Sequence, residues 1–505
     1  MTSVRGRQHP SWLVLLLVAT GSGAGCIGDP GRPEDSEDLV SVSSAEFFGT
    51  GNPFGTETAV TSSISNGGLG EFVMTSNANS DSPFLTYNNN SRQIRPSTSL
   101  MTFKVLAPDD EGGNILASGR IRPPGNWTVL WGDPAIVRNK ANSSFIYLAN
   151  LAVPSSKFPS GVIEGAINPT TGIPANFCGA FIGGACIARS SNAGRTFTLA
   201  TSDCLQRITG SCPFGSFYDG SALETSPEGR VYAAFTDVFR ARYDVYMATS
   251  LTGGFSLVTD PPTSSVFAHP RIKMGSNGLY MLTWDGFNLN ILRYPAGSSF
   301  TAAWTSPVNV ATSAESIGTI TLSDRSIRTG PQYDLAIGKN ENNVEEIRVI
   351  FEVVVSGKHK LRVAKCTLGT PITCSQPSVW RTDGVAGDQW GPSITTGNTF
   401  STGAPFWMFT YYNNQNFSTG NQVEIWTGLL PSSFTASFTR RENLAQVPCP
   451  DLRGYWGDYD YMLTGNTGSG PPGLTFRGFS LSGSSCVRSN FTSNSLSDSY
   501  SSLLQ

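Results

Sequence analysis

The stretch from Trp131 to Val137 (WGDPAIV) decides the fold, because its pattern returns along the chain. In its clearest copies it is a short apolar run that begins with a polar residue and then Pro or Gly. Six such runs start the repeating units, and their first residues are Asp133, Asp219, His269, Tyr333, Gly391 and Asp458. A unit that returns about every 60 residues is typical of supersecondary elements packed side by side.

Further β-forming runs follow each start. The second runs cover residues 145–149, 231–235, 279–284, 347–351, 406–411 and 474–479, and the third cover 187–190, 244–250, 289–294, 360–365 and 423–427. Aromatic and β-branched residues dominate them, as buried strands require. No helical period lies between them, which excludes an α/β chain. We therefore predict an all-β protein, a single β-propeller with four-stranded antiparallel blades.

The six starts predict six blades. Seven stays an open alternative, because residues 50–95 also contain β-like runs. The runs at residues 99–106 and 115–121 are expected to complete the last blade, so that both ends of the chain share one sheet.

Composition excludes several functions. Only 14% of the 505 residues are charged, and the net charge is −3, so the chain has no electrostatic footprint for nucleic acid. With 39% hydrophobic and 11% aromatic residues it can build a core, which excludes general disorder.

The first residues resemble a bacterial export signal. Arg5 and Arg7 precede an apolar run at residues 12–20 that is too short to span a bilayer, and small residues lead to Cys26. We expect residues 1–25 to be a lipoprotein signal peptide and Cys26 to carry the lipid, with an ordinary secretory peptide as the alternative. Residues 26–50 then form an acidic Pro/Gly linker, residues 51–488 the propeller and residues 489–505 a flexible tail. The protein is expected in the cell envelope or outside the cell.

Eight further cysteines support export, since an even number suits disulfides in an oxidising compartment. Proximity in the sequence predicts the pairs Cys178–Cys186, Cys204–Cys212, Cys366–Cys374 and Cys449–Cys486. No C-x-x-C occurs and the chain has three His, so a zinc site is not expected.

One motif carries a family resemblance. Ser190, Asn192, Gly194, Thr196 and Phe197 spell S-x-N-x-G-x-T-F, which resembles the Asp-box of bacterial neuraminidase repeats with Asn in the acidic position. The chain thus resembles the sialidase-like (BNR-repeat) propellers, which implies that the box lies in the turn between the third and fourth strands of a blade. Such boxes are structural, so they indicate the fold and not an activity.

The strand starts converge on one mouth of a propeller, and they provide the candidate catalytic residues. These are Asp133, Asp219, His269, Arg271, Tyr333 and Asp458. Acids at strand starts also cap local turns, and that reading stays open. The aromatic residues nearby are candidate sugar-binding residues, with packing between blades as the alternative: Trp131, Trp390, Trp456 and Tyr459.

These observations favour a monomeric, non-catalytic propeller that binds a glycan or a protein and meets the membrane only through its lipid. The alternative is a sialidase-like glycoside hydrolase or a polysaccharide lyase at the channel mouth. The resemblance implies that a sialidase would gather three arginines there, for which Arg120, Arg122 and Arg271 are the candidates. No cofactor is required, and a calcium ion in the polar channel is left open.

Overall fold

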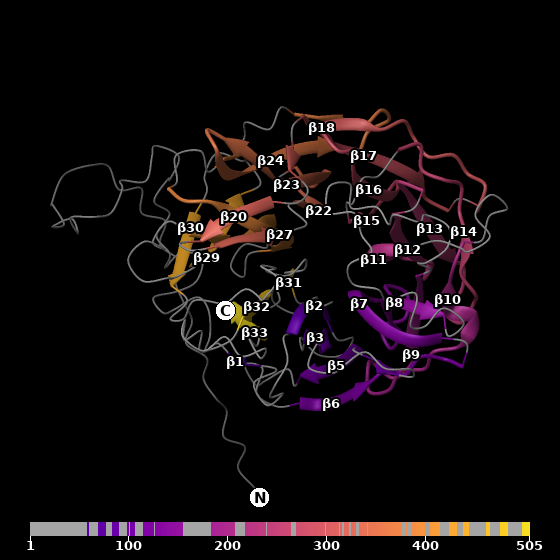
Figure 1. Cartoon of the computed structure of the whole chain (residues 1–505). Helices are drawn as coiled ribbons and strands as arrows, with labels where there is room; N and C mark the ends of the chain where they lie inside the picture. Colours follow the sequence, from indigo (N-terminus) through magenta and orange to yellow (C-terminus); the bar gives the residue numbers. More distant parts are fainter. Residues whose placement is uncertain are drawn as a thin grey trace, which may run out of the picture.

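The computed structural model consists of β-strands arranged as blades around a common centre (Figure 1). It describes residues 58–59, 69–76, 83–89, 98–99, 101–106, 115–125, 127–154, 183–207, 218–238, 240–263, 269–297, 299–312, 314–315, 318–322, 325–329, 333–340, 342–375, 380–381, 386–398, 405–414, 424–431, 438–443, 461–464, 475–482 and 497–504.

Seven sheets of four or more strands form within these ranges, and each is a blade numbered from the inner strand outward. Blade 1 is β2 (Leu69–Ser76), β3 (Pro83–Asn89), β5 (Met101–Leu106) and β6 (Ile115–Arg120); blade 2 is β7 (Trp127–Arg138), β8 (Ile146–Pro154), β9 (Gly184–Ser190) and β10 (Cys204–Leu205). Blade 3 is β11 (Tyr218–Thr225), β12 (Val231–Asp237), β13 (Arg242–Ala248) and β14 (Ser256–Leu257); blade 4 is β15 (Arg271–Gly275), β16 (Gly278–Trp284), β17 (Asn288–Pro295) and β18 (Val308–Thr312).

Blade 5 is β22 (Tyr333–Lys339), β23 (Glu345–Val355), β24 (Lys358–Thr367) and β25 (Thr373–Cys374); blade 6 is β27 (Gln389–Asn398), β28 (Pro405–Asn413), β29 (Glu424–Pro431) and β30 (Phe438–Asn443). Blade 7 is β31 (Tyr461–Thr464), β32 (Thr475–Ser482), β33 (Ser497–Leu504) and β1 (Thr58–Ala59). The short strands β4 (Thr98–Ser99), β19 (Ala314–Glu315) and β26 (Trp380–Arg381) add to blades 2 and 5, and β20 (Gly318–Leu322) pairs with β21 (Arg325–Thr329).

The inner strands close a ring. Each contacts the next in the order β2, β7, β11, β15, β22, β27 and β31, and β31 contacts β2 again (Figure 1). The prediction of an all-β propeller with four-stranded antiparallel blades is confirmed, and the count is seven, the alternative that the sequence left open. The six starts did not include the first blade because β2 (LGEFVMTS) begins without the polar residue and Pro or Gly of the clearest copies.

The two ends of the chain meet in blade 7, although through other strands than expected. The runs assigned to this joint are β5 and β6, which belong to blade 1. Blade 7 is completed instead by β1, which pairs with β33. Since β33 covers residues 497–504, this part of the expected flexible tail is a strand.

The apolar core lies between the faces of neighbouring blades. Blades 2 and 3 share one buried cluster that includes Tyr147, Leu223 and Phe235, and blades 4 and 5 share another that includes Leu289, Ile291 and Val349. The alternation of inward and outward residues along each strand produces this face-to-face packing.

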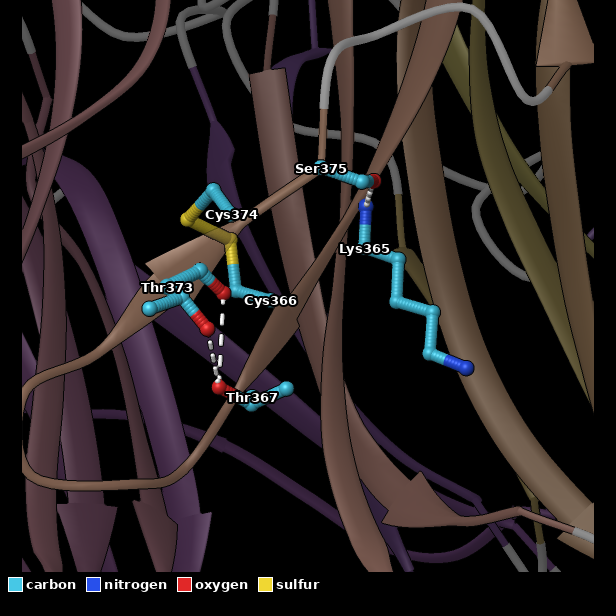
Figure 2. Close-up of a disulfide and its surroundings, with 6 residues drawn as sticks. All are labelled: Lys365, Cys366, Thr367, Thr373, Cys374 and Ser375. Carbon is cyan, nitrogen blue, oxygen red and sulfur yellow. Dashed lines mark hydrogen bonds between the residues drawn. A yellow bond between two sulfur atoms is a disulfide. The ribbon is translucent and has the colours of Figure 1, made fainter.

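Among the described residues, two disulfides join neighbouring strands. Cys366 bonds Cys374 across β24 and β25, as predicted, and Figure 2 shows the hydrogen bond of 2.7 Å between the hydroxyls of Thr367 and Thr373 beside it. Cys186 bonds Cys204, so the predicted pairs Cys178–Cys186 and Cys204–Cys212 are wrong. The reason is the register, which places Cys186 of β9 directly opposite Cys204 of β10. Residues Cys178, Cys212, Cys449 and Cys486, like Cys26, lie outside the described residues.

Candidate functional site

The edge of the ring at which the inner strands begin carries the predicted site, and we call it the leading face. Strands within a blade are antiparallel, so the turn between the second and third strands lies on the same face. In blade 3, for example, Asp237 at the end of β12 pairs with Tyr218 at the start of β11. The leading face therefore gathers the strand starts together with the β12–β13, β16–β17 and β23–β24 turns.

Asp219 lies at a β-bulge on this face. The register of β11 and β12 shifts between Asp219 and Ser221, and Gly220 within the bulge has a φ of 60°. The Asp219 side chain is half-buried, and its Oδ1 accepts a hydrogen bond of 3.2 Å from the backbone N–H of Gly220. The inner strand of blade 2 has a matching shift between Gly132 and Ala135, which brackets Asp133.

His269 packs directly against this bulge. A Cβ built on Gly220 would lie 2.6 Å from Cδ2 of His269, so the absence of a side chain there admits the imidazole. His269 is buried, and its backbone carbonyl accepts a hydrogen bond of 2.7 Å from the hydroxyl of Tyr333. The predicted residues Asp219, His269 and Tyr333 thus come together across blades 3, 4 and 5.

Tyr333 is a structural member of this group. Its side chain is completely buried, and burial raises its pKa well above the ordinary value. A hydroxyl in this state, donating to a backbone carbonyl, does not reach a substrate. Its hydroxyl instead joins blade 5 to the segment that leads into blade 4.

Arg271 and Asp334 form the next contact along the ring. The Nε atom of Arg271 lies 3.8 Å from Oδ1 of Asp334. Asp334 also accepts hydrogen bonds from the backbone N–H groups of Leu335 at 2.9 Å and Ile394 at 3.0 Å, and from the Ser393 hydroxyl at 3.2 Å. The Asp334 carboxylate thus joins blades 5 and 6. This geometry supports a structural capping role for Asp334.

An ion-pair cluster that sequence analysis missed lies on the leading face of blade 3. Arg207 Nη1 lies 3.0 Å from Asp244 and 2.6 Å from Asp260, and Arg242 Nε lies 3.2 Å from Asp244. The hydroxyl of Tyr218 donates a hydrogen bond of 2.9 Å to Asp244. Burial raises the pKa of Asp244 in spite of the opposing charge of Arg242. The signal in the sequence was an acid within an otherwise apolar strand.

The arginines proposed for a sialidase do not converge. Arg120 ends β6, the outermost strand of blade 1, and Arg122 follows it, whereas Arg271 begins β15, the innermost strand of blade 4. Figure 1 shows β6 at the periphery and β15 beside the centre. The arginine clamp expected from the family resemblance is therefore wrong for these three residues.

One of the predicted sugar-binding aromatics, Trp390, is a core residue. Trp390 is completely buried and stacks on Tyr412 with ring centroids 5.5 Å apart, so it packs within blade 6. Trp131 is described through the backbone of β7, and Trp456, Asp458 and Tyr459 lie outside the described residues. Two aromatics that the sequence did not single out, Trp284 and Phe287, lie at the β16–β17 turn on the leading face.

The Asp-box residues form a hydrogen-bonded turn between β9 and β10, where they were expected. The Ser190 hydroxyl accepts the N–H of Gly194 at 2.8 Å, and Asn192 Oδ1 accepts the N–H of Thr196 at 3.0 Å. Phe197 packs on Phe103 of blade 1. These contacts give Asn192 the turn-capping role of the acidic residue.

Neither a metal site nor a membrane helix is present in the described ranges. No group of three or more His, Cys, Asp or Glu there is arranged to hold a metal ion. No helix of that part of the chain has the length and apolarity to cross a membrane. The calcium ion stays a prediction.

No family profile and no curated protein matches this sequence. Solved structures do resemble it. An α-L-arabinofuranosidase from Fusarium graminearum has a TM-score of 0.44 at 10% identity, over 90% of this chain and 98% of that one. A leech intramolecular trans-sialidase has a TM-score of 0.44 at 10% identity, over 78% and 70%. An α-L-arabinanase from Penicillium chrysogenum has 0.40 at 9%, over 75% and 95%.

The chain has a β-propeller fold. At 9 to 10% identity the likeness concerns the fold. The three are named as an arabinofuranosidase, a trans-sialidase and an arabinanase, which contradicts the expectation of a non-catalytic binder.

Proposed function

We propose that this protein is an exported glycoside hydrolase that acts at the leading face. The observation that carries the proposal is the pair of aspartates at matching β-bulges of adjacent inner strands, Asp133 on β7 and Asp219 on β11. Glycoside hydrolysis needs two carboxyl groups beside one glycosidic bond, one as acid and the other as nucleophile or base. We assign Asp219 and Asp133 to this pair, with His269 holding the Asp219 bulge in place.

Charge on the leading face supports a neutral glycan as substrate. Arg207 and Arg242 contact the carboxylates of Asp244 and Asp260, and Arg271 faces Asp334. An arginine already matched by a carboxylate offers little net attraction to an acidic sugar. A neutral sugar needs hydrogen bonds and apolar contact alone.

A substrate panel tests the proposal. It contains aryl glycosides and oligosaccharides of neutral sugars, including α-L-arabinofuranosides and arabinobiose, and an aryl sialoside. We expect turnover of a neutral member, and a 10²- to 10⁴-fold loss of kcat in Asp219→Asn and in Asp133→Asn. If one of the two aspartates is the nucleophile, azide should restore turnover to its alanine variant, Asp219→Ala or Asp133→Ala, and yield a glycosyl azide.

Asp260→Asn is the matched control, because Asp260 is a more exposed carboxylate on the same face that contacts Arg207 and Arg242. It should retain full activity. The proposal is wrong if the wild-type protein cleaves no member of the panel, or if the Asp219 and Asp133 variants turn over as fast as the control.

Export agrees with the two cross-strand disulfides, which persist in oxidising compartments. We propose further that Cys26 carries a lipid. Metabolic labelling with an alkyne fatty acid should mark the wild-type protein and not Cys26→Ala. Equal labelling of both proteins would refute lipidation at this residue.

A further inference from the structure

The β16–β17 turn on the leading face of blade 4 is held rigidly by one carboxylate. Asp285 Oδ1 accepts the backbone N–H groups of Phe287 at 3.1 Å and Asn288 at 2.7 Å. Its Oδ2 accepts the side-chain amides of Asn288 at 3.3 Å and Asn290 at 3.1 Å. Burial works against the charge, but these hydrogen bonds lower the pKa of Asp285, so the anchor stays ionised. Gly286, with a φ of 102°, allows the chain to turn so tightly.

This rigid turn presents an aromatic side chain to solvent. Phe287 is 55% exposed, while the neighbouring Trp284 is half-buried against the core between blades 4 and 5. The backbone of Trp284 is fixed too, since the hydroxyl of the buried Tyr243 donates to its carbonyl at 3.2 Å and accepts from its N–H at 3.1 Å. The backbone that carries both aromatics is therefore fixed, so that binding would cost the turn little conformational entropy.

The turn adjoins the proposed catalytic position. Arg271 of β15 pairs with Leu282 of β16, so the segment that leads from His269 into β15 and the segment that leads from β16 into the turn lie at the same end of this strand pair. His269 in turn packs against Gly220, next to Asp219. From Asp219 outward along the leading face, the chain thus offers His269, then Trp284, then the exposed Phe287.

We propose that Trp284 and Phe287 form a sugar-stacking subsite, which binds a neutral sugar ring beside the one whose bond is cleaved. This inference rests on the proposed function. The face of a neutral sugar carries C–H groups that pack well on an aromatic ring, and binding sites combine such apolar contact with a few fixed polar groups. The side-chain amides of Asn288 and Asn290 are occupied by Asp285, so the contact offered by this turn is mainly apolar. The leading-face arginines near the site are matched by carboxylates, so a neutral ring fits better than an acidic one.

The test compares Phe287→Ala with Phe287→Trp and with the control Val344→Ala. Val344 is 57% exposed, and it lies in the β22–β23 turn at the opposite end of its blade. For an oligosaccharide substrate, we expect Phe287→Ala to lower kcat/KM roughly 3- to 10-fold, mainly through KM. Phe287→Trp should keep the wild-type value, and so should Val344→Ala. For an aryl glycoside with a single sugar, Phe287→Ala should match the wild type.

A binding measurement separates this inference from the proposed function. The inactive Asp219→Asn protein is titrated with the same oligosaccharide by calorimetry, with and without Phe287→Ala. Weaker binding in the double variant supports the subsite. If the wild type cleaves the oligosaccharide but Phe287→Ala changes neither KM nor binding, the subsite is wrong and the hydrolase stands. If neither cleavage nor binding of any panel member occurs, both proposals are wrong.

Discussion

Gly220 lacks a side chain at the point where His269 of the next blade makes contact. This is a property of one residue with a consequence for the whole site, because the contact holds the bulge that carries Asp219. The sequence showed Asp219-Gly220 as turn chemistry. The imidazole against the glycine comes from another blade and is visible only in the fold.

Gly220→Ala should destabilise the protein by about 2–5 kcal/mol, because the left-handed φ costs about 1–2 kcal/mol and the collision with His269 adds about 1–3 kcal/mol. Gly297→Ala is the control, since Gly297 has a φ of 67° and no atom within 4 Å of an added Cβ. It should lose about 1–2 kcal/mol in denaturant unfolding. Equal losses of unfolding free energy in both variants would show that the collision with His269 does not contribute to the destabilisation.

Asn150 on β8 is a buried amide for which neither Nδ2 nor Oδ1 has a hydrogen-bond partner among the described residues. An unsatisfied buried polar group is costly, so Asn150→Val should raise the free energy of unfolding by about 1–2 kcal/mol. Asn139→Val in the same blade should lower it, because Asn139 hydrogen-bonds Ala141, Asn142 and Gly229. Destabilisation of both variants alike would contradict this account.

Strands and turns are the scale at which the sequence predicted most. Alternating and apolar runs indicated β12, β16 and β23 to within a few residues, since a strand buried on both faces has a recognisable composition. Cross-strand partners were harder to predict. Cys366 and Cys374 lie on a short hairpin and were paired correctly, whereas the bond of Cys186 with Cys204 depends on a register between strands separated by a longer loop.

An ion pair connects blades 2 and 3 at the ends of their inner strands. Lys140 after β7 lies 2.9 Å from Glu224 at the end of β11. Burial opposes the charge of Glu224, but Lys140 and Lys273 lower its pKa below the usual 4.5. A lowered pKa in the folded protein adds stability that is present above pH 4.5 and is lost as the pH falls through the folded value.

Lys140→Met should therefore cost about 1–2 kcal/mol at neutral pH, with the difference from wild type shrinking below pH 4.5. Urea unfolding between pH 3 and pH 7 measures it, and the same change at the exposed Lys339 serves as control. A difference that stays constant with pH would rule out the ion pair as its cause.

Strands from the two ends of the chain complete blade 7 and so close the ring. β33 pairs with β32 along eight residues and with β1 from the other end of the chain. Deleting residues 497–505 should therefore open blade 7, lower the thermal midpoint and broaden the single unfolding transition, because the edge of β32 loses its ladder. Removing Gln505 alone, which lies beyond β33, should change neither. Unchanged circular-dichroism melting of the longer deletion would show that the joint does not stabilise the ring.

The sequence by itself determined the all-β class, the repeating strand starts, the Asp-box turn and the Cys366–Cys374 bond, because each depends on composition or on contacts a few residues apart. Only the tertiary structure decided the seventh blade, the Cys186–Cys204 bond, the separation of Arg120 and Arg122 from Arg271, and the meeting of Gly220, His269 and Tyr333. Those contacts join blades, and their partners are set by the closure of the ring and the register of its strands. The candidate role of the exposed Phe287 was also decided only by the tertiary structure, because an aromatic residue in a turn indicates a binding site only when the site beside it is known.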